Sequence, residues 1–183
     1  MEYPLGVKFR YDSAPLLLEI PEVYSTEECK NFITRIEGAA PTIATNNPLY
    51  RNQDRVMFDD PVASKDLFSR IKHNLPQEIE GFTLKGINER LRCYRYVTGQ
   101  KFDPHMDHWY QATDSEISLY SVLAYFNSDF EGGETRFMEE IEATIKPEIG
   151  KVAIFQHKVR HEGCEVTKGR KFAMRTDVMY EKS

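Results

Sequence analysis

Residues 171–180 read KFAMRTDVMY (Lys171–Tyr180), and this stretch decides the fold because its side chains alternate in character. Successive side chains of an extended strand point to opposite faces. One face carries Phe172, Met174, Thr176, Val178 and Tyr180, and the other carries Lys171, Ala173, Arg175, Asp177 and Met179. The pattern predicts a strand with one face on a core and one polar face turned toward an interior.

Four segments before this strand have the same character, being rich in β-branched and aromatic residues and bounded by Gly, Pro, Asn and Asp. No helical period intervenes between them. They are residues 90–97, 118–127, 135–138 and 151–155. The segments predict a block of strands that fills the second half of the chain.

Two amphipathic helices are predicted before the strands. The first begins at a capping box, Ser25 to Glu28, and ends near Gly38, and the second begins at Asp60 and Pro61 and ends before Pro76. Helices first and strands afterwards predict an α+β protein whose strands form a sandwich or jelly-roll barrel, with the helices outside one sheet.

The segment from Pro41 to Asp59 breaks the helical pattern with polar and turn-forming residues (TNNPLYRNQDR). It predicts a long exposed loop, and such loops in compact domains often have a function. With Arg51 and Arg55 it is a candidate substrate loop, and the alternative is an ordinary surface loop.

Length and composition favour one globular domain over residues 1–183, since 183 residues with 40% apolar and 12% aromatic residues can form one core. A net charge of −5 gives no basic field for nucleic acid or an anionic membrane. The N-terminal segment lacks the pattern of a signal peptide, and no apolar run could span a bilayer, so a cytoplasmic location is expected. Three cysteines without CxxC spacing predict reduced thiols.

The motif His105-Met106-Asp107 is a candidate metal site. On an extended chain residues two apart share a face, so His105 and Asp107 can converge on one ion. A distant histidine would complete two imidazoles and a carboxylate, the arrangement that leaves open positions on non-haem Fe(II). Both His157 and His161 are candidates for it, and an isolated HxD is common by chance.

Basic side chains on the inward face of residues 171–180 need an anionic partner. For Lys171 and Arg175 this is either a carboxylate of the chain such as Asp177 or the carboxylate of a bound dicarboxylic molecule. Tyr96, on the strand at residues 90–97, could donate its hydroxyl to the same carboxylate, although most such tyrosines belong to a core.

Three stretches resemble the iron(II)- and 2-oxoglutarate-dependent dioxygenases, and among them the prolyl 4-hydroxylase-like catalytic domain. They are RCYRYVTGQKFDPHMD, YSVLAYFNSDFEGGETRF and KPEIGKVAIFQHKVRHEGCEVTKGRKFAMRTDVMY, which together cover roughly residues 90–180. By this resemblance His105, Asp107 and His161 are the iron ligands, Lys171 binds the tail of 2-oxoglutarate, and Tyr96 contacts the co-substrate. The spacing in the family favours His161 over His157.

The resemblance implies a double-stranded β-helix, a cupin-like jelly roll, over residues 90–183, with residues 1–89 as helical support and substrate loop. It implies hydroxylation of an unactivated C–H bond with Fe(II), 2-oxoglutarate and O2, release of succinate and CO2, and in some members a need for ascorbate. The expected substrate is a prolyl residue of a protein or peptide. The alternatives are the same chemistry on a small molecule or another side chain, a sensor module that binds metal or 2-oxoglutarate without turnover, and a zinc hydrolase.

Overall fold

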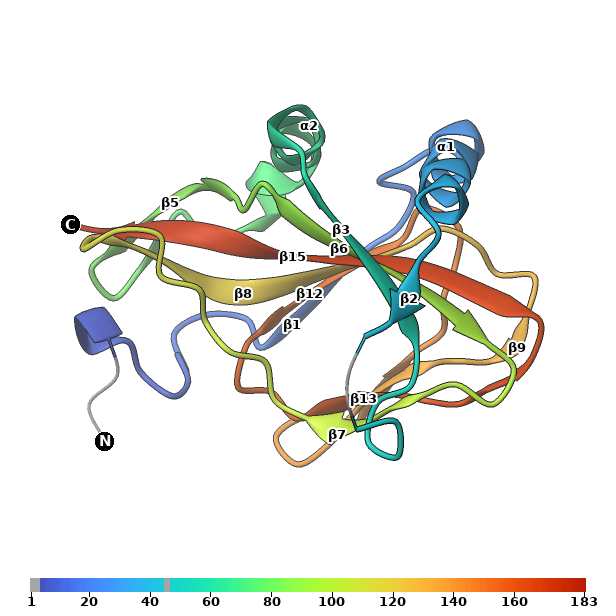
Figure 1. Ribbon diagram of the computed structural model, residues 1–183. Coiled ribbons are helices and arrows are strands. Elements are labelled where there is room, and N and C mark those ends of the chain that lie inside the picture. Colours follow the sequence, from blue (N-terminus) through green and yellow to red (C-terminus); the bar gives the residue numbers. More distant parts are fainter. Residues whose placement is uncertain (1–3, 45–46) are drawn as a thin grey trace.

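The computed structural model describes residues 4–44 and 47–183, and strands make up most of it (Figure 1). Its two α-helices are α1 (Thr26–Gly38) and α2 (Pro61–Ile71), and both lie on the same side of the largest sheet. Two short 3-10 helices, Pro4–Gly6 and Lys72–Asn74, complete the helical part. No helix in the described part of the chain is both long and apolar enough to cross a membrane.

Both helices begin where the sequence predicts. The Ser25 side chain accepts a hydrogen bond from the Glu28 amide, and the Glu28 carboxylate accepts one from the Ser25 amide, so the predicted capping box is complete. The carboxylate of Asp60 caps α2 through the Ala63 amide, and Pro61 occupies the first helical position, where its missing N–H costs nothing.

The largest sheet has nine strands, and its centre is the long strand β15 (Arg170–Lys182) between β8 (Glu116–Tyr125) and β6 (Arg90–Val97). Beyond β8 lie β12 (Val152–Gln156) and β1 (Leu17–Ile20), and beyond β6 lie β3 (Asp54–Asp59) and β2 (Thr42–Ile43). The far end of β15 also pairs with β5 (Phe82–Ile87), which pairs with β4 (Glu78–Ile79).

A second sheet of four strands lies under the first, as β7 and β13 show in Figure 1. Its order is β11 (Ala143–Ile145), β10 (Thr135–Phe137), β13 (His161–Gly163) and β7 (Phe102–His105). A two-stranded sheet joins β9 (Glu131–Gly132) to β14 (Val166–Lys168). Two facing sheets with helices outside one of them confirm the predicted α+β jelly roll.

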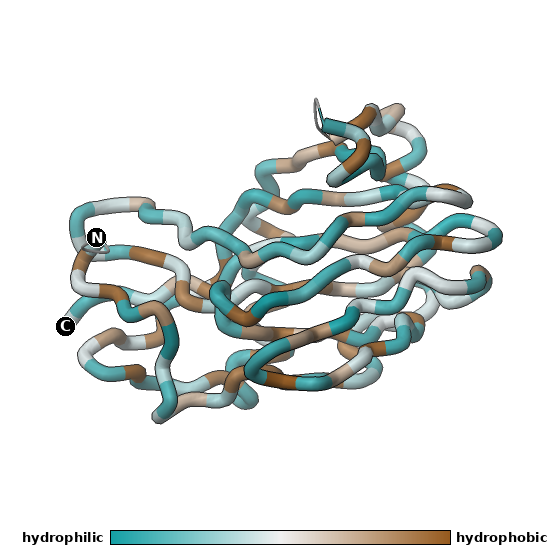
Figure 2. Tube along the Cα trace, turned by 90° about the horizontal axis from the view of Figure 1, so that it is seen from below, coloured by the Kyte–Doolittle hydropathy of each residue, from teal (hydrophilic) through white to brown (hydrophobic). Residues whose placement is uncertain are grey.

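The alternation along residues 171–180 is confirmed. Phe172, Met174, Val178 and Tyr180 belong to the main core cluster, which also contains Ile36 of α1 and Leu67 of α2. A second cluster fills the space between the two sheets and includes Tyr125, Phe137, Phe155 and Ala173. Hydrophobic and hydrophilic residues are interspersed along the neighbouring strands in Figure 2, as expected for strands whose two faces differ.

The prediction of a continuous exposed loop from Pro41 to Asp59 is wrong. Residues 42–43 and 54–59 form β2 and β3, and β3 pairs with β6 over its whole length. Val56 and Phe58 pack against the main core, while Arg55 lines a pocket on the other face. A charged residue on the inner face of this strand weakens the hydrophobic alternation, so the sequence pattern is typical of a loop. Residues 45–46 of this segment lie outside the described residues.

Candidate metal centre

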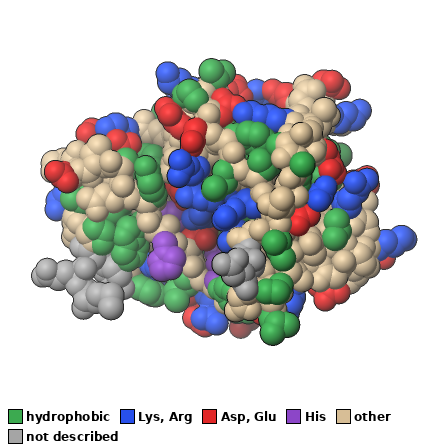
Figure 3. Space-filling model, in the orientation of Figure 1, with side chains coloured by type: hydrophobic (Ala, Val, Ile, Leu, Met, Phe, Trp, Pro, Cys, Tyr) green, Lys and Arg blue, Asp and Glu red, His purple; other side chains and the backbone are tan. Residues whose placement is uncertain are grey.

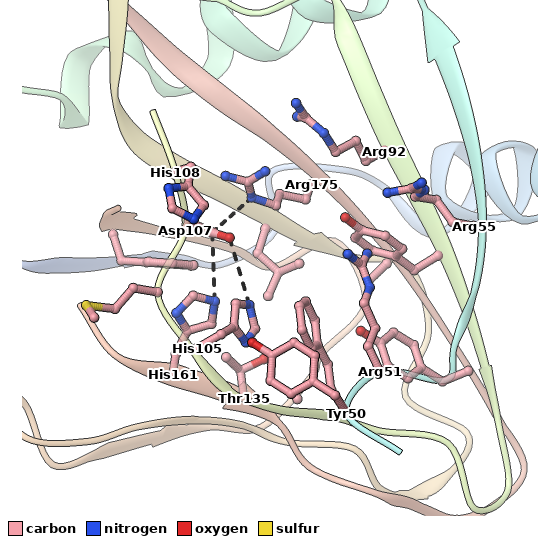
Figure 4. A pocket seen from close by; sticks show the side chains of 18 of the residues that line it. Tyr50, Arg51, Arg55, Arg92, His105, Asp107, His108, Thr135, His161 and Arg175 are labelled. Atoms are coloured by element: carbon pink, nitrogen blue, oxygen red, sulfur yellow. Dashed lines mark hydrogen bonds and ion pairs between the residues drawn. The ribbon is translucent and has the colours of Figure 1, made fainter. Parts of the chain in front are cut away.

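His105, Asp107 and His161 lie together between the two sheets, and one ligand atom from each falls within 4.8 Å of the others. His105 ends β7 and His161 begins β13, and the two residues are direct partners in the pairing of these strands. Asp107 follows β7 by two residues. Its Oδ1 is 3.8 Å from Nε2 of His105, and its Oδ2 is 3.8 Å from Nε2 of His161 (Figure 4).

Backbone carbonyls fix which nitrogen of each histidine is free. Nδ1 of His105 is 2.8 Å from the carbonyl oxygen of Asp103, and Nδ1 of His161 is 3.0 Å from that of Val159. A carbonyl can only accept, so each Nδ1 carries the proton and each Nε2 of the neutral ring has a lone pair. Both lone pairs belong to the nitrogens nearest Asp107, as metal binding requires.

Burial keeps both histidines neutral. It lowers the pKa of His105 to about 4, an effect that the neighbouring His161 increases. Burial also lowers the pKa of His161. Both rings are therefore uncharged at neutral pH and do not need to lose a proton before they bind a cation.

Asp107 is ionised although it is buried. Burial alone would raise its pKa, but the charge of Arg175, the two histidines and the hydroxyl of Ser121 together lower it well below its ordinary value. Nε of Arg175 donates to Oδ2 of Asp107 at 2.9 Å, and the Ser121 hydroxyl donates to the same oxygen at 2.6 Å. Oδ1 faces His105 and receives neither of these bonds.

His157, the other candidate for the third ligand, has a different environment. Its Nε2 lies 2.8 Å from the Ser118 hydroxyl, and its Nδ1 lies 2.8 Å from that of Ser121. Both ring nitrogens are thus engaged. The structure brings His161, and not His157, together with His105 and Asp107, and it makes His157 a buried support for the serine that contacts Asp107.

Lys171 lies in the same pocket with an exposed fraction of 2%. Its Nζ donates to the Gly133 carbonyl at 2.6 Å and lies 5.0 Å from the ring centroid of Tyr96 and 5.5 Å from that of Tyr125. No carboxylate among the described residues forms an ion pair with it. Burial lowers the pKa of Lys171 to about 8, so the side chain is still mostly charged at neutral pH.

The glycine turn after β9 bears on this lysine. Gly133 has φ +71°, and a Cβ there would lie 3.2 Å from Cδ of Lys171 and 2.9 Å from the ring of Phe130. The turn therefore needs glycine for its backbone and leaves room for the lysine. The turn is structural, and its open space at Gly133 accommodates the Lys171 side chain.

Tyr96 and Arg175 also line the pocket, in different settings. Tyr96 is paired in register with Lys171, and burial raises the pKa of its hydroxyl, which stays protonated and able to donate. The guanidinium of Arg175 contacts Asp107 through Nε, and Nη2 lies 3.2 Å from Ser121 Oγ and 3.0 Å from Asp177 Oδ1. In this structure Arg175 therefore contacts the chain's own carboxylates.

The pocket has a volume of about 480 Å³. It opens on the face shown in Figure 3, where basic side chains gather in a hollow beside the histidines. Phe102 forms part of its wall and stacks on His105 with 3.6 Å between ring centroids, and Phe155 packs against His161 at 4.5 Å. Aromatic rings thus shield the histidines on the protein side.

These donors fit a divalent iron ion with a dicarboxylate. Two neutral imidazole nitrogens and one carboxylate on one side of a pocket are the donor set of non-haem Fe(II) oxygenases. A buried ammonium that donates to a carbonyl and lies near aromatic faces suits a carboxylate, because a buried charge is costly without an ion-pair partner. A carboxylate bound at Lys171 would supply that charge.

Residues 91–176 match the family model of the 2OG-Fe(II) oxygenase superfamily. Among curated proteins, the chain is 25% identical over 120 residues to probable prolyl 4-hydroxylase 7 of Arabidopsis thaliana. That alignment covers 62% of the chain but only 38% of the plant protein.

Solved structures share the fold at low sequence identity. A viral collagen prolyl hydroxylase from Paramecium bursaria Chlorella virus-1, in a complex with 2OG, superposes with a TM-score of 0.67 at 19% identity, covering 92% of this chain and 98% of the viral one. A prolyl hydroxylase from Trichoplax adhaerens, in complex with a hypoxia inducible factor peptide fragment, gives a TM-score of 0.66 at 13% identity, covering 91% and 84%. Their likeness to this chain is one of fold.

Proposed function

We propose that the chain is a 2-oxoglutarate-dependent dioxygenase that hydroxylates a prolyl residue of a protein or peptide, because residues 91–176 match the 2OG-Fe(II) oxygenase superfamily. The observation that carries the proposal is the triad of His105, Asp107 and His161 in one pocket with the buried, unpaired ammonium of Lys171. The plant and viral relatives described as prolyl hydroxylases support the choice of substrate.

In this proposal Nε2 of His105, Nε2 of His161 and the carboxylate of Asp107 hold Fe(II). Iron and 2-oxoglutarate held there would supply the activation of O2, with succinate and CO2 as the products of the co-substrate. Arg175 and Ser121 keep the Asp107 carboxylate ionised and oriented from the side away from His105. The aromatic walls formed by Phe102 and Phe155 exclude water from the ligands.

Lys171 binds the far carboxylate of 2-oxoglutarate, and the Tyr96 hydroxyl donates to the same carboxylate. Both residues lie on neighbouring strands in register, β15 and β6, so their side chains project from the same face of the large sheet. Holding the co-substrate at its two ends fixes its orientation relative to the metal. Arg175 acts on Asp107 in this proposal and does not bind the tail.

The decisive experiment is an anaerobic titration of the chain with Fe(II) and then 2-oxoglutarate, followed by exposure to O2. A charge-transfer absorption on addition of 2-oxoglutarate and iron-dependent release of succinate are expected, and both should be lost in His105→Ala. A chain that forms the absorbing complex but never releases succinate would be a sensor module. A chain that forms no such complex would contradict the proposal.

Mass spectrometry of proline-containing peptides then identifies the substrate, since hydroxylation adds one oxygen atom. An iron- and 2-oxoglutarate-dependent gain of that mass on proline is the expected result. Oxygen gained only on another side chain or on a small molecule would support the proposed reaction but contradict the prolyl substrate.

A cytoplasmic location and a role for ascorbate in keeping the iron reduced belong to the same proposal. Cys29, Cys93 and Cys164 are free thiols, as expected for a reducing compartment. Loss of activity during turnover that ascorbate prevents would support its role.

A further inference from the structure

One wall of the pocket carries more basic side chains than the proposed binding of metal and 2-oxoglutarate requires. Five lining residues are basic, and Asp107 is the one carboxylate among the described residues that line the pocket. The basic residues are Arg51, Arg55, Arg92, Lys171 and Arg175. This concentration is local, because the whole chain has a net charge of −5.

Strand register explains how the arginines come together. Arg92 of β6 pairs directly with Arg175 of β15, and Arg55 of β3 pairs with Tyr94, two residues along β6 from Arg92. All three side chains project from the same face of the large sheet, and Figure 4 shows them on one side of the site. Like charges opposite one another in a sheet destabilise it unless anions neutralise them.

The chain neutralises only part of this charge. Arg175 pairs with Asp107 and with Oδ1 of Asp177, and Nη1 of Arg92 pairs with the other oxygen of Asp177 at 3.1 Å. Two guanidinium groups thus share the one buried carboxylate of Asp177. In the proposed function the Asp107 carboxylate binds the metal. Arg55 pairs with no carboxylate in the part of the chain that the structure describes.

Arg51 is held in place without an anion. The buried amide of Gln53, with its oxygen turned toward the guanidinium, accepts from Nε of Arg51 at 2.9 Å. The guanidinium carbon lies 4.4 Å from the ring centroid of Phe102 and 5.4 Å from that of Tyr94. A neutral amide and aromatic faces orient this cation and leave its charge uncompensated.

Arg92 and Arg175 are separate along the strands from the predicted 2-oxoglutarate site. Lys171 pairs in register with Tyr96, whereas Arg175 pairs with Arg92. Tyr96 and Arg92 are four residues apart on one strand, which corresponds to about 13 Å. A second anion can therefore bind at Arg92 while a dicarboxylate occupies the site at Lys171.

We propose that Arg55 and Arg92, with Arg51 beside them, bind a carboxylate of the prime substrate, so that the substrate is an acidic peptide with a glutamate or aspartate near the hydroxylated proline. This rests on the proposed function. Guanidinium groups bind carboxylates with paired, charge-assisted hydrogen bonds. The exposed rings of Tyr50 and Tyr110 line the same pocket and offer a peptide an apolar contact beside the charge.

The test uses peptides with capped termini that differ in one residue, glutamate or glutamine, placed at each of the positions flanking a single proline. In at least one position the glutamate peptide should be hydroxylated with a kcat/KM at least about tenfold above its glutamine partner, because a carboxylate forms charge-assisted hydrogen bonds with the half-buried guanidinium groups and a glutamine amide does not. Arg55→Gln should reduce this ratio toward one, and Arg55→Glu should bring it below one. Lys65→Gln on the exposed face of α2 is the matched control and should keep the wild-type ratio.

Calorimetric binding of the same peptides to the metal-free chain separates this proposal from the proposed function. Tighter binding of the glutamate peptide that depends on Arg55 supports the acidic substrate even in a chain that releases no succinate. Equal binding and equal turnover of the glutamate and glutamine peptides at every position, with normal iron-dependent release of succinate, would overturn the inference and leave the proposed function intact.

Discussion

Arg175 donates from Nε to Oδ2 of Asp107 at 2.9 Å, so the carboxylate that faces the two histidines is held by a buried guanidinium on its other side. The same guanidinium reaches Asp177, which also pairs with Arg92. The candidate metal ligand is thus one end of a chain of alternating charges. Its geometry depends on residues that do not contact the metal.

Arg175→Gln should weaken metal binding and destabilise the fold. Removing one partner of a buried ion pair leaves a buried charge uncompensated, which costs about 3–5 kcal/mol, and loss of a group that orients a metal ligand typically lowers metal affinity about 10–100-fold. Denaturant unfolding and a metal titration measure the two effects. Arg90→Gln, which removes an exposed pair with Asp59, is the control and should change neither. Unchanged metal affinity in Arg175→Gln would mean that Asp107 needs no such support.

The two candidate histidines should respond differently to substitution. His161→Ala should abolish metal binding, whereas His157→Phe should retain it and lose about 1–3 kcal/mol of stability because the buried hydroxyls of Ser118 and Ser121 lose a partner. Metal content after equilibration with Fe(II) under anaerobic conditions distinguishes the two. The reverse result, with metal retained in His161→Ala and lost in His157→Phe, would reassign the third ligand.

Binding of 2-oxoglutarate should weaken above about pH 8. Burial lowers the pKa of Lys171 to about 8, so the free chain loses the ammonium charge as the pH rises through that value. Affinity should be constant below it and should fall by up to about tenfold per pH unit above it, because binding must then take up a proton. Both histidines are already neutral in this range and add no slope. Titrations between pH 6.5 and 9.5 measure the effect.

Lys171→Met is the control for this pH dependence. The variant should bind 2-oxoglutarate weakly and with no step near pH 8. Without co-substrate, the wild type should gain stability relative to the variant as the pH rises from about 8 toward 10.5, since the unfolded chain there holds the lysine proton more tightly than the folded one. If the variant showed the same change in affinity near pH 8 as the wild type, a group other than Lys171 would be responsible for it.

Gly150 should tolerate no side chain. It has φ +77°, and a Cβ there would lie 1.9 Å from the carbonyl oxygen of Tyr24, while the Gly150 carbonyl accepts from the amides of Val23 and Tyr24. Gly150→Ala should therefore destabilise the protein by about 1–3 kcal/mol or more. Gly38→Ala, where a Cβ would meet no atom within 4 Å, is the matched control and should be neutral or slightly stabilising. Equal unfolding midpoints for the two variants would contradict this account.

Local patterns made much of the fold predictable. The Ser25 capping box and the Asp60-Pro61 start of α2 are short-range signals, and the alternation at residues 171–180 follows from the period of a strand. Strand β3 was missed because its inner face carries Arg55 in place of an apolar residue. Strands β7 and β13 have only four and three residues, too few to show a period.

The sequence predicted which residues lie together in the candidate site but not the network around them. His105, Asp107 and Lys171 stand in motifs that can be read along the chain. Ser121 and His157 support Asp107 through contacts between residues 14 and 36 positions apart, which no local spacing reveals. Arg175 lies 68 residues from Asp107 along the chain, so no local spacing predicts that the two side chains form a hydrogen bond.

The two sheets contribute different parts of the pocket. Both histidines come from the four-stranded sheet, whereas Arg55, Arg92, Arg175 and Lys171 come from the nine-stranded sheet. Phe155, from β12 of the nine-stranded sheet, packs on His161 of the other sheet. The distance between the two sheets would therefore set how closely a substrate bound at the arginines approaches a metal bound at the histidines. Regioselectivity, meaning which carbon of the substrate reacts, then depends on the thickness of the hydrophobic layer between the sheets as well as on the residues that touch the substrate.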